Sequence, residues 1–181
     1  MAEFTDEELL EMFDKEDTKH YAFNLLMTRY QQRVYWHVRR IVISHDDAND
    51  LTQDVFVKVW KSLATFRRDS QLFTWLYRIA TNESLSFIKT KNRRFFLPLD
   101  NAVGELSKHL TTDQYFSGDR IQLKLQQAVL KLPPQQRIIF NMKYFEAMKY
   151  EEIAEVLKLS VGALKASYHH AVKKIEKYML D

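Results

Sequence analysis

Apolar side chains recur every three or four residues through most of this chain, and that spacing constrains its fold more than any other feature. Between residues 20 and 43 the recurring side chains are Phe23, Met27, Tyr30, Val34, Val38 and Ile41. Such a period places apolar residues on one face of an α-helix. The chain has only three glycines and three prolines in 181 residues, which disfavours turn-rich β-sandwiches and barrels. The sequence therefore predicts an all-α protein.

Capping residues and prolines mark where the individual helices begin and end. Thr5, followed three residues later by Glu8, fits a capping box and starts a short acidic helix. Pro133 and Pro134 end one helix and begin another, because proline suits the first helical turn. The predicted helices cover 5–16, 20–43, 47–64, 71–90, 121–132, a segment beginning at Pro134, 150–157 and 161–179.

Charge and composition divide these helices into two blocks. Residues 18–94 hold fourteen basic and six acidic side chains, and residues 121–181 hold ten and six. The stretch between them, 95–120, is acidic, contains one proline and two glycines, and has no clear period. We predict two small helical domains, 1–94 and 121–181, joined by a linker at 95–120. Basic blocks suggest polyanionic partners, although two solvated helical surfaces would have the same charge.

Missing residue types exclude several classes of function. Without cysteine there is no disulfide framework, thiolate metal site or cysteine nucleophile. Neither glycine-rich phosphate-binding pattern, G-x-G-x-x-G or G-x-x-x-x-G-K, occurs in the chain. No apolar run approaches the ~20 residues that span a bilayer, and the acidic amino terminus is unlike a secretory signal. We expect a cytoplasmic protein that is not an enzyme, with no cofactor, metal, small-molecule substrate or membrane insertion.

Residues 150–170 have the spacing of a helix-turn-helix. Ile153, Leu157 and Leu164 would pack inward, and Ser160 would cap the second helix. The second helix of such a motif can enter the DNA major groove, although a plain helical hairpin has the same spacing. Lysine can bind guanine edges or phosphates, and serine can bind either. The candidate DNA contacts are Ser160, Lys165, Ser167, His169, His170, Lys173 and Lys174.

Two details of this motif give separate expectations. Lys158 lies where such turns often have glycine, and a left-handed backbone there would cost lysine ~1 kcal/mol relative to glycine. His169 and His170 could suggest a metal site. Adjacent residues on a helix diverge by about 100°, however, so we do not expect one ion to be shared between them.

A polar face on the predicted helix 47–64 is acidic within an otherwise basic block. Its members are spaced at i, i+3, i+4 and i+7, opposite the apolar residues of the same helix, and are Asp50, Gln53, Asp54 and Val57. A solvated face whose acids match the helix dipole would explain it. A docking surface for a protein is the second interpretation, and a carboxylate metal site is a third.

A cationic stripe follows on the predicted helix 71–90 and its continuation. Arg78, Asn82, Ser86, Lys89 and Arg93 share one helical face, next to an aromatic-rich loop. Cations bind phosphates, while aromatic side chains and asparagine can hold the bases of a single strand. The alternative is that the aromatic residues are core and the basic residues are merely solvated. For Trp75 we favour the core.

Several motifs, in this order, resemble the extracytoplasmic-function group of the sigma-70 family, the bacterial transcription initiation factors. Asp-Leu-Thr-Gln-Asp-Val-Phe at 50–56 is similar to the family's core-polymerase-binding helix. Phe-Arg-Arg-Asp-Ser at 66–70, with Thr-Trp-Leu-Tyr-Arg-Ile-Ala-Thr-Asn at 74–82, is similar to its promoter-melting segment. The family's second DNA-binding domain resembles Leu-Pro-Pro-Gln-Gln-Arg at 132–137 and the helix-turn-helix residues. The resemblance covers about 20–94 and 121–178.

The resemblance implies roles for residues in both domains. The first domain would bind core RNA polymerase through Asp50, Gln53, Asp54 and Val57. It would open and hold the −10 element through Phe66, Arg67, Arg68, Asp69, Ser70, Arg78, Asn82, Lys89, Arg93 and Arg94. The second domain would bind the −35 element of promoter DNA, although the family often has arginine where this chain has Ser167, His170 and Val172. An anti-sigma factor is also implied as a partner.

Two other classes of function compete with this reading. A free-standing helix-turn-helix regulator would bind a duplex operator without polymerase. A helical enzyme acting on nucleic acid would need a catalytic triad, metal cluster or phosphate loop, and the sequence offers none of these.

Overall fold

The computed structural model describes residues 4–95 and 120–180, and every regular element in those two stretches is a helix. In chain order the elements are α1 (Asp6–Phe13), α2 (Lys19–Val42), α3 (His45–Ser62), the 3₁₀ turn η1 (Leu63–Thr65), α4 (Leu72–Phe95), α6 (Arg120–Leu130), α7 (Pro134–Phe140), the π-helical turn η3 (Asn141–Phe145), α8 (Tyr150–Leu157) and α9 (Val161–Leu180). The all-α prediction is confirmed. The predicted linker lies outside the described residues except at its two ends.

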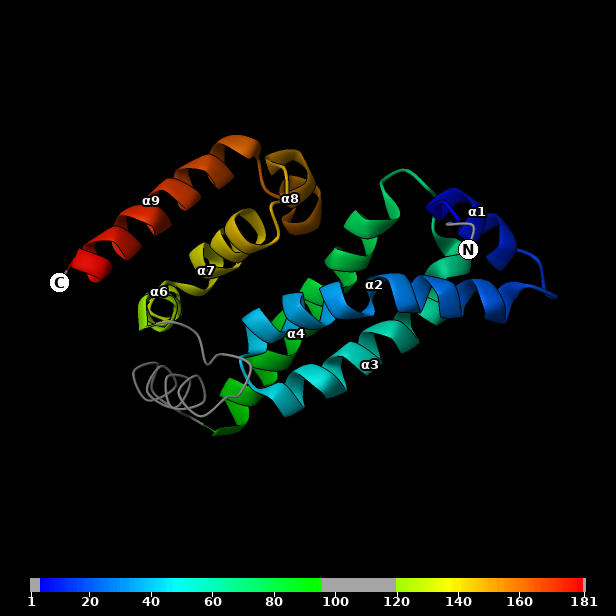
Figure 1. Ribbon diagram of the computed structural model, residues 1–181, viewed down its shortest axis with the longest axis horizontal. Helices are drawn as coiled ribbons and strands as arrows, with labels where there is room; N and C mark the ends of the chain where they lie inside the picture. The colour runs from blue at the N-terminus through cyan, green and yellow to red at the C-terminus, as the bar shows by residue number, and fades with distance from the viewer. Residues whose placement is uncertain (1–3, 96–119, 181) are drawn as a thin grey trace.

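Helices α1 to α4 form the first domain, on the right of Figure 1. The long helices α2, α3 and α4 pack on one another, and the apolar period recognised in the sequence supplies their contacts. Val34 and Val38 of α2 and Val55 of α3 are fully buried. Ser44 caps α3 by accepting a hydrogen bond from the Asp47 amide. Among the helices of residues 4–95 and 120–180, none combines the length and the apolar character that a membrane span requires.

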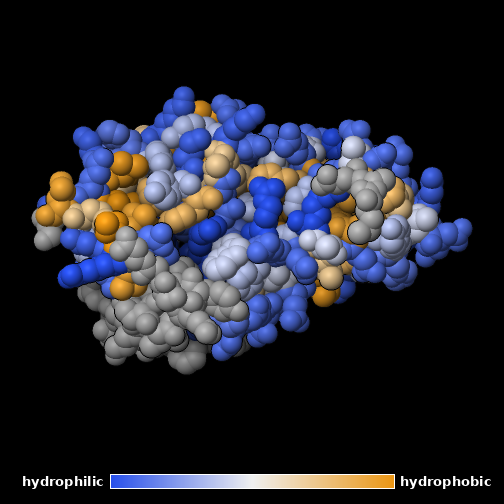
Figure 2. All heavy atoms as spheres, in the orientation of Figure 1, coloured by the Kyte–Doolittle hydropathy of each residue, from blue (hydrophilic) through white to orange (hydrophobic). Residues whose placement is uncertain are grey.

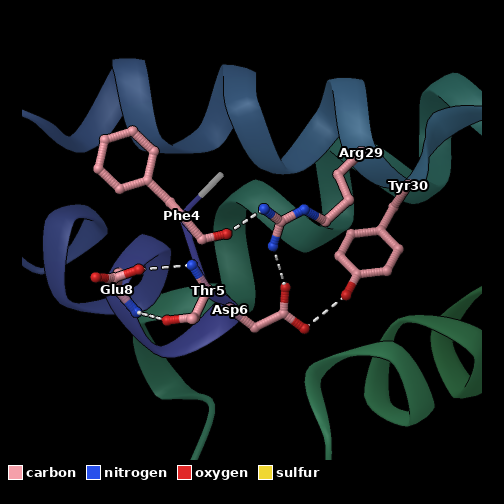
Figure 3. A network of polar contacts seen from close by, with 6 residues as sticks. All are labelled: Phe4, Thr5, Asp6, Glu8, Arg29 and Tyr30. Carbon is pink, nitrogen blue, oxygen red and sulfur yellow. Dashed lines mark hydrogen bonds and ion pairs between the residues drawn. The ribbon is translucent and has the colours of Figure 1, made fainter. Parts of the chain in front are cut away.

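The acidic helix α1 is fastened to α2 by a polar network (Figure 3). Thr5 and Glu8 form the predicted capping box, with both reciprocal hydrogen bonds present. The Asp6 carboxylate accepts from Arg29 Nη1 at 2.7 Å and from the Tyr30 hydroxyl at 2.6 Å. Burial and the adjacent carboxylate raise the pKa of Tyr30. Because the other face of α1 buries Leu9, Leu10 and Phe13, this helix is an integral part of the first domain.

Helices α6 to α9 form the second domain, on the left of Figure 1. Pro134 occupies the first turn of α7, as predicted from Pro133-Pro134. Ala171 and Ile175 of α9 pack with Ala128 and Phe140 in a separate small core. The π-helical turn η3, which continues α7, was not expected from the sequence. It ends at Phe145, Glu146 caps it, and Ala147 follows with a positive φ of 52°.

The two domains pack directly against each other. Helix α8 lies on α4, and η3 contacts α2. Met142, Met148 and Ile153 of the second domain are buried in the same apolar cluster as the core of the first. Figure 2 shows strongly hydrophilic side chains in the middle of the viewed face, between the part that contains α9 and the part that contains α1. No feature of the sequence indicates how the two domains are placed.

Candidate polymerase and nucleic-acid interfaces

The acidic face of α3 is exposed to solvent. Leu51, Val55 and Val59 are buried on the opposite side of the helix. Asp50, Gln53 and Asp54 are all exposed, and Val57 retains 52% of its accessible surface. Within the described part of the chain neither Asp50 nor Asp54 forms an ion pair with a basic side chain. This ridge of Asp50, Gln53, Asp54 and Val57 is therefore available to another molecule.

The loop between η1 and α4 exposes charged side chains and is supported by two packed aromatic rings. Phe66 packs on Trp75 with ring centres 5.0 Å apart, and both rings are partly buried against the core. Arg67, Arg68 and Asp69 are exposed, whereas Ser70 is half-buried. Arg68 has a positive φ of 56°, and its Nη2 lies 2.7 Å from Asp14 Oδ2. Trp75 therefore packs partly buried against the core, as interpreted from the sequence, and it also contacts the loop through Phe66.

The candidate cationic stripe on α4 is largely exposed to solvent over its described residues. Arg78 is half-buried, and Asn82, Ser86 and Lys89 are exposed. Arg93 and Arg94 belong to α4, but their side chains lie outside the described residues. Glu83, next to the stripe, forms an ion pair with Lys58 of α3. That contact ties α3 to α4, so an acidic residue at this position has a structural role.

The helix-turn-helix is formed as predicted from its spacing. Lys158 ends α8 in the left-handed conformation, with φ 55° and ψ 45°. Ser160 caps α9 by accepting a hydrogen bond from the Ala163 amide at 3.2 Å. Ser167 is half-buried, and the remaining candidates on α9 are exposed: Lys165, His169, His170, Lys173 and Lys174. The outer face of α9 therefore presents cations and hydrogen-bonding groups.

The metal-site alternatives receive no support from the geometry. The rings of His169 and His170 are 6.1 Å apart and tilted by 59°. Over the residues that can be described, no group of three or more histidine and carboxylate side chains could hold a metal ion.

A polar contact between the domains was missed at the sequence level. The side chain of Glu146, which follows η3, reaches the first domain and is only 8% exposed. Its carboxylate accepts from Arg40 Nη1 of α2 and from the Tyr77 hydroxyl of α4, the latter at 2.9 Å. Burial, with the Glu146 charge, raises the pKa of Tyr77. A lone glutamate between two helices has no periodic signal, so only the tertiary contact identifies it.

A groove of about 910 Å³ runs beside this contact. Its walls come from α1, α2, the loop before α4 with the start of that helix, and α8 with the segment that joins it to η3. Arg33 and Arg68 face it from the first domain, and Glu146 and Glu152 from the second. The loop proposed to hold promoter DNA is thus part of an interdomain groove.

These features define a two-domain helical protein with a helix-turn-helix in its second domain and exposed cationic faces in both. Two family models match it: the one described as Sigma-70 region 2 covers residues 26–94, and the one described as Sigma-70, region 4 covers residues 122–175. The chain belongs to the sigma-70 family of RNA polymerase sigma factors, in its extracytoplasmic-function (ECF) group.

Known relatives match along nearly the whole chain. The ECF RNA polymerase sigma-E factor of Haemophilus influenzae is 32% identical over 97% of this chain and 96% of its own length. The RNA polymerase sigma-H factor of Pseudomonas aeruginosa is 29% identical over 95% of this chain and 92% of its own. The protein is therefore a sigma factor that directs promoter recognition and transcription initiation by RNA polymerase.

Two solved structures share its fold. The sigma factor RpoE from Bartonella quintana, solved in complex with the anti-sigma factor NepR, gives a TM-score of 0.68 at 21% identity, covering 87% of this chain and 96% of its own. CnrH, solved in complex with the cytosolic domain of CnrY, gives a TM-score of 0.68 at 24% identity, covering 95% of each chain.

Proposed function

We propose that three surfaces divide the work of initiation between the two domains. The α3 ridge binds core polymerase, the loop at 66–71 with α4 holds the opened −10 element, and α9 lies in the major groove of the −35 element. The domains extend over 1–94 and 121–181, and residues 95–120 connect them. The observation that supports this most strongly is the exposure of the acidic α3 ridge within the otherwise basic stretch 18–94.

Each surface has the chemistry that its role needs. The charged groups of the ridge would add specificity and association rate at a protein interface. Unstacking a base costs a few kcal/mol, so a loop that captures the base favours opening of the duplex. Arg78, Lys89, Arg93 and Arg94 would bind phosphates beside Asn82, the base-reading side chain. On α9, Lys165, Lys173 and Lys174 would bind phosphates, and Ser167, His169 and His170 would lie nearer the bases.

The factor acts in the cytoplasm, where its template is, and catalyses no reaction itself. We also expect an anti-sigma factor to hold it inactive. Of the two solved structures described above, one is a complex with an anti-sigma factor and the other is a complex with the cytosolic domain of a second protein. Such an inhibitor would compete with core polymerase for this chain.

Reconstitution with purified bacterial core polymerase tests the division of labour. Holoenzyme should start transcripts at defined genomic sites, and sequencing those transcripts should show two spaced motifs upstream of each start. A chain that fails to co-elute with core, or that alone protects a palindromic duplex operator, would instead be a free-standing regulator.

A further inference from the structure

Glu146 occupies an anion-binding site that belongs to the first domain. The donors are Arg40 of α2 and Tyr77 of α4, and both contact the carboxylate of this one residue from the second domain. Tyr77 is fully buried, so its hydroxyl position is fixed by packing. Guanidinium and phenol donors suit a phosphate oxygen as well as a carboxylate oxygen. The bound carboxylate therefore marks a place where the first domain can hold an anion.

The surroundings of this site favour a nucleic-acid strand over a small anion. The guanidinium of Arg33 lies 4.2 Å from the ring centre of Phe73, one turn before Tyr77. An arginine beside an aromatic ring of the same domain is an arrangement found in proteins that bind single strands.

The site is continuous with the proposed −10 surface. Glu146 and Arg33 line the same groove as the loop before α4 and the first residues of that helix. Arg40 and Tyr77 are joined to this groove through Glu146, whose carboxylate they hold. Acidic side chains line the groove from both domains, Glu7 and Glu11 from α1 and Glu152 and Glu155 from α8, and they repel phosphates. Separation of the domains would remove only the α8 pair.

The packed arrangement is incompatible with simultaneous contact to both promoter elements. The −10 and −35 elements are separated by about 25 base pairs, or about 85 Å of duplex at 3.4 Å per pair. In the structure α8 lies on α4, beside the loop that would hold the −10 element. The domains must therefore separate on the promoter, and separation withdraws Glu146 from its site.

We propose that Arg40 and Tyr77, with Arg33 beside them, bind a backbone phosphate of the unpaired promoter strand, and that Glu146 competes with this phosphate while the domains are packed. The proposal rests on the assigned role of the loop at 66–71 in holding the −10 element. One carboxylate thus holds the domains together and blocks a DNA contact.

The test uses the full chain and a fluorescent single-stranded oligothymidylate, with binding measured by anisotropy. Glu146→Gln removes the competing charge, and Glu151→Gln removes the same charge from an exposed position on α8 as the matched control. We expect Glu146→Gln to bind about fivefold tighter than Glu151→Gln, because a larger fraction of molecules has an open site. Adding Arg40→Gln or Tyr77→Phe to Glu146→Gln should abolish that gain.

Domain separation is measured on the same variants by small-angle X-ray scattering. A larger radius of gyration for Glu146→Gln, with no gain in affinity over Glu151→Gln, would overturn the phosphate site. An unchanged radius and unchanged affinity would overturn the competition. Should Glu146→Gln fold poorly by circular dichroism, Glu146→Ala tests the same expectation.

Transcription with core polymerase separates failure of this inference from failure of the proposed function. If the wild-type chain initiates transcription normally but the oligothymidylate measurements show no role for Arg40 and Tyr77, only the proposed phosphate site is wrong. Wild-type chain that gives no promoter-directed transcript would remove the role of the loop on which the site depends.

Discussion

His37 Nε2 of α2 lies 2.8 Å from Thr81 Oγ1 of α4 in the interior of the first domain. The Thr81 hydroxyl donates its single hydrogen to the Tyr77 carbonyl at 2.7 Å, so it accepts from His37. His37 is fully buried, and its ring lies 4.5 Å from that of Tyr77. The pair therefore fixes α2 against α4 beside the interdomain contact, with a hydrogen on Nε2 of His37.

This arrangement predicts a loss of stability in mild acid. Burial, helped by the charge of Arg40, lowers the pKa of His37 to about 3 from its ordinary 6.5. Between these values the unfolded chain binds a proton that the native chain does not. The contribution of His37 to the free energy of unfolding is therefore fully present above about pH 6.5. Below that pH it falls by about 1.4 kcal/mol per pH unit. Urea unfolding at pH 7 and pH 5 should show His37→Gln losing about 2 kcal/mol less than wild type.

The control for this prediction is His169→Gln, whose histidine is exposed on α9. It should retain the wild-type dependence on pH. Equal losses for wild type and His37→Gln would show that His37 does not govern acid stability.

The backbone at Lys158, in the turn between α8 and α9, has a conformation that glycine would adopt at a lower cost in free energy. Lys158 has a left-handed backbone, in which a side chain is disfavoured relative to glycine. Lys158→Gly should therefore stabilise the chain by ~1 kcal/mol and raise the melting temperature by about 2–4 °C. The same replacement in the interior of α9, Lys173→Gly, should cost ~1 kcal/mol. If calorimetry finds that both variants are destabilised, the turn is not strained.

The α3 ridge predicts a specific loss of polymerase binding. Asp54→Arg reverses a charge at an exposed position, so the fold and the melting temperature should stay as in wild type. Affinity for core polymerase should fall about tenfold or more, because like charges across an interface repel. Asp17→Arg makes the same change at an exposed residue before α2 and should bind core normally. Equal affinities for the two variants would remove the docking role of α3.

The cations of α9 predict a change in salt dependence rather than in sequence preference. Lys173→Gln with Lys174→Gln should weaken binding to every duplex similarly and reduce the slope of log affinity against log salt by about 2. Titrations of holoenzyme on promoter fragments at several salt concentrations measure this slope. Lys61→Gln, at an exposed residue late in α3, should leave it unchanged. A slope that does not move would place α9 away from the phosphate backbone.

Local patterns in the sequence determined most of the secondary structure. The apolar period identified α2, α3 and α4, and short-range side-chain chemistry located the starts of α7 and α9 at Pro134 and Ser160. These signals act between residues within one or two helical turns, so they can be read along the chain. The exposure of the α3 ridge followed for the same reason, since a helix that buries one face presents the other.

Contacts between residues far apart in sequence were decided only by the tertiary structure. Glu146 lies more than 60 residues from Tyr77 and more than 100 from Arg40, and nothing local to it distinguishes it from a solvated acid. The same holds for Asp14 and Arg68, and for Glu83 and Lys58. A hydrogen bond or ion pair depends on where packing brings two side chains, and periodicity specifies faces of single helices, not the partners that those faces meet.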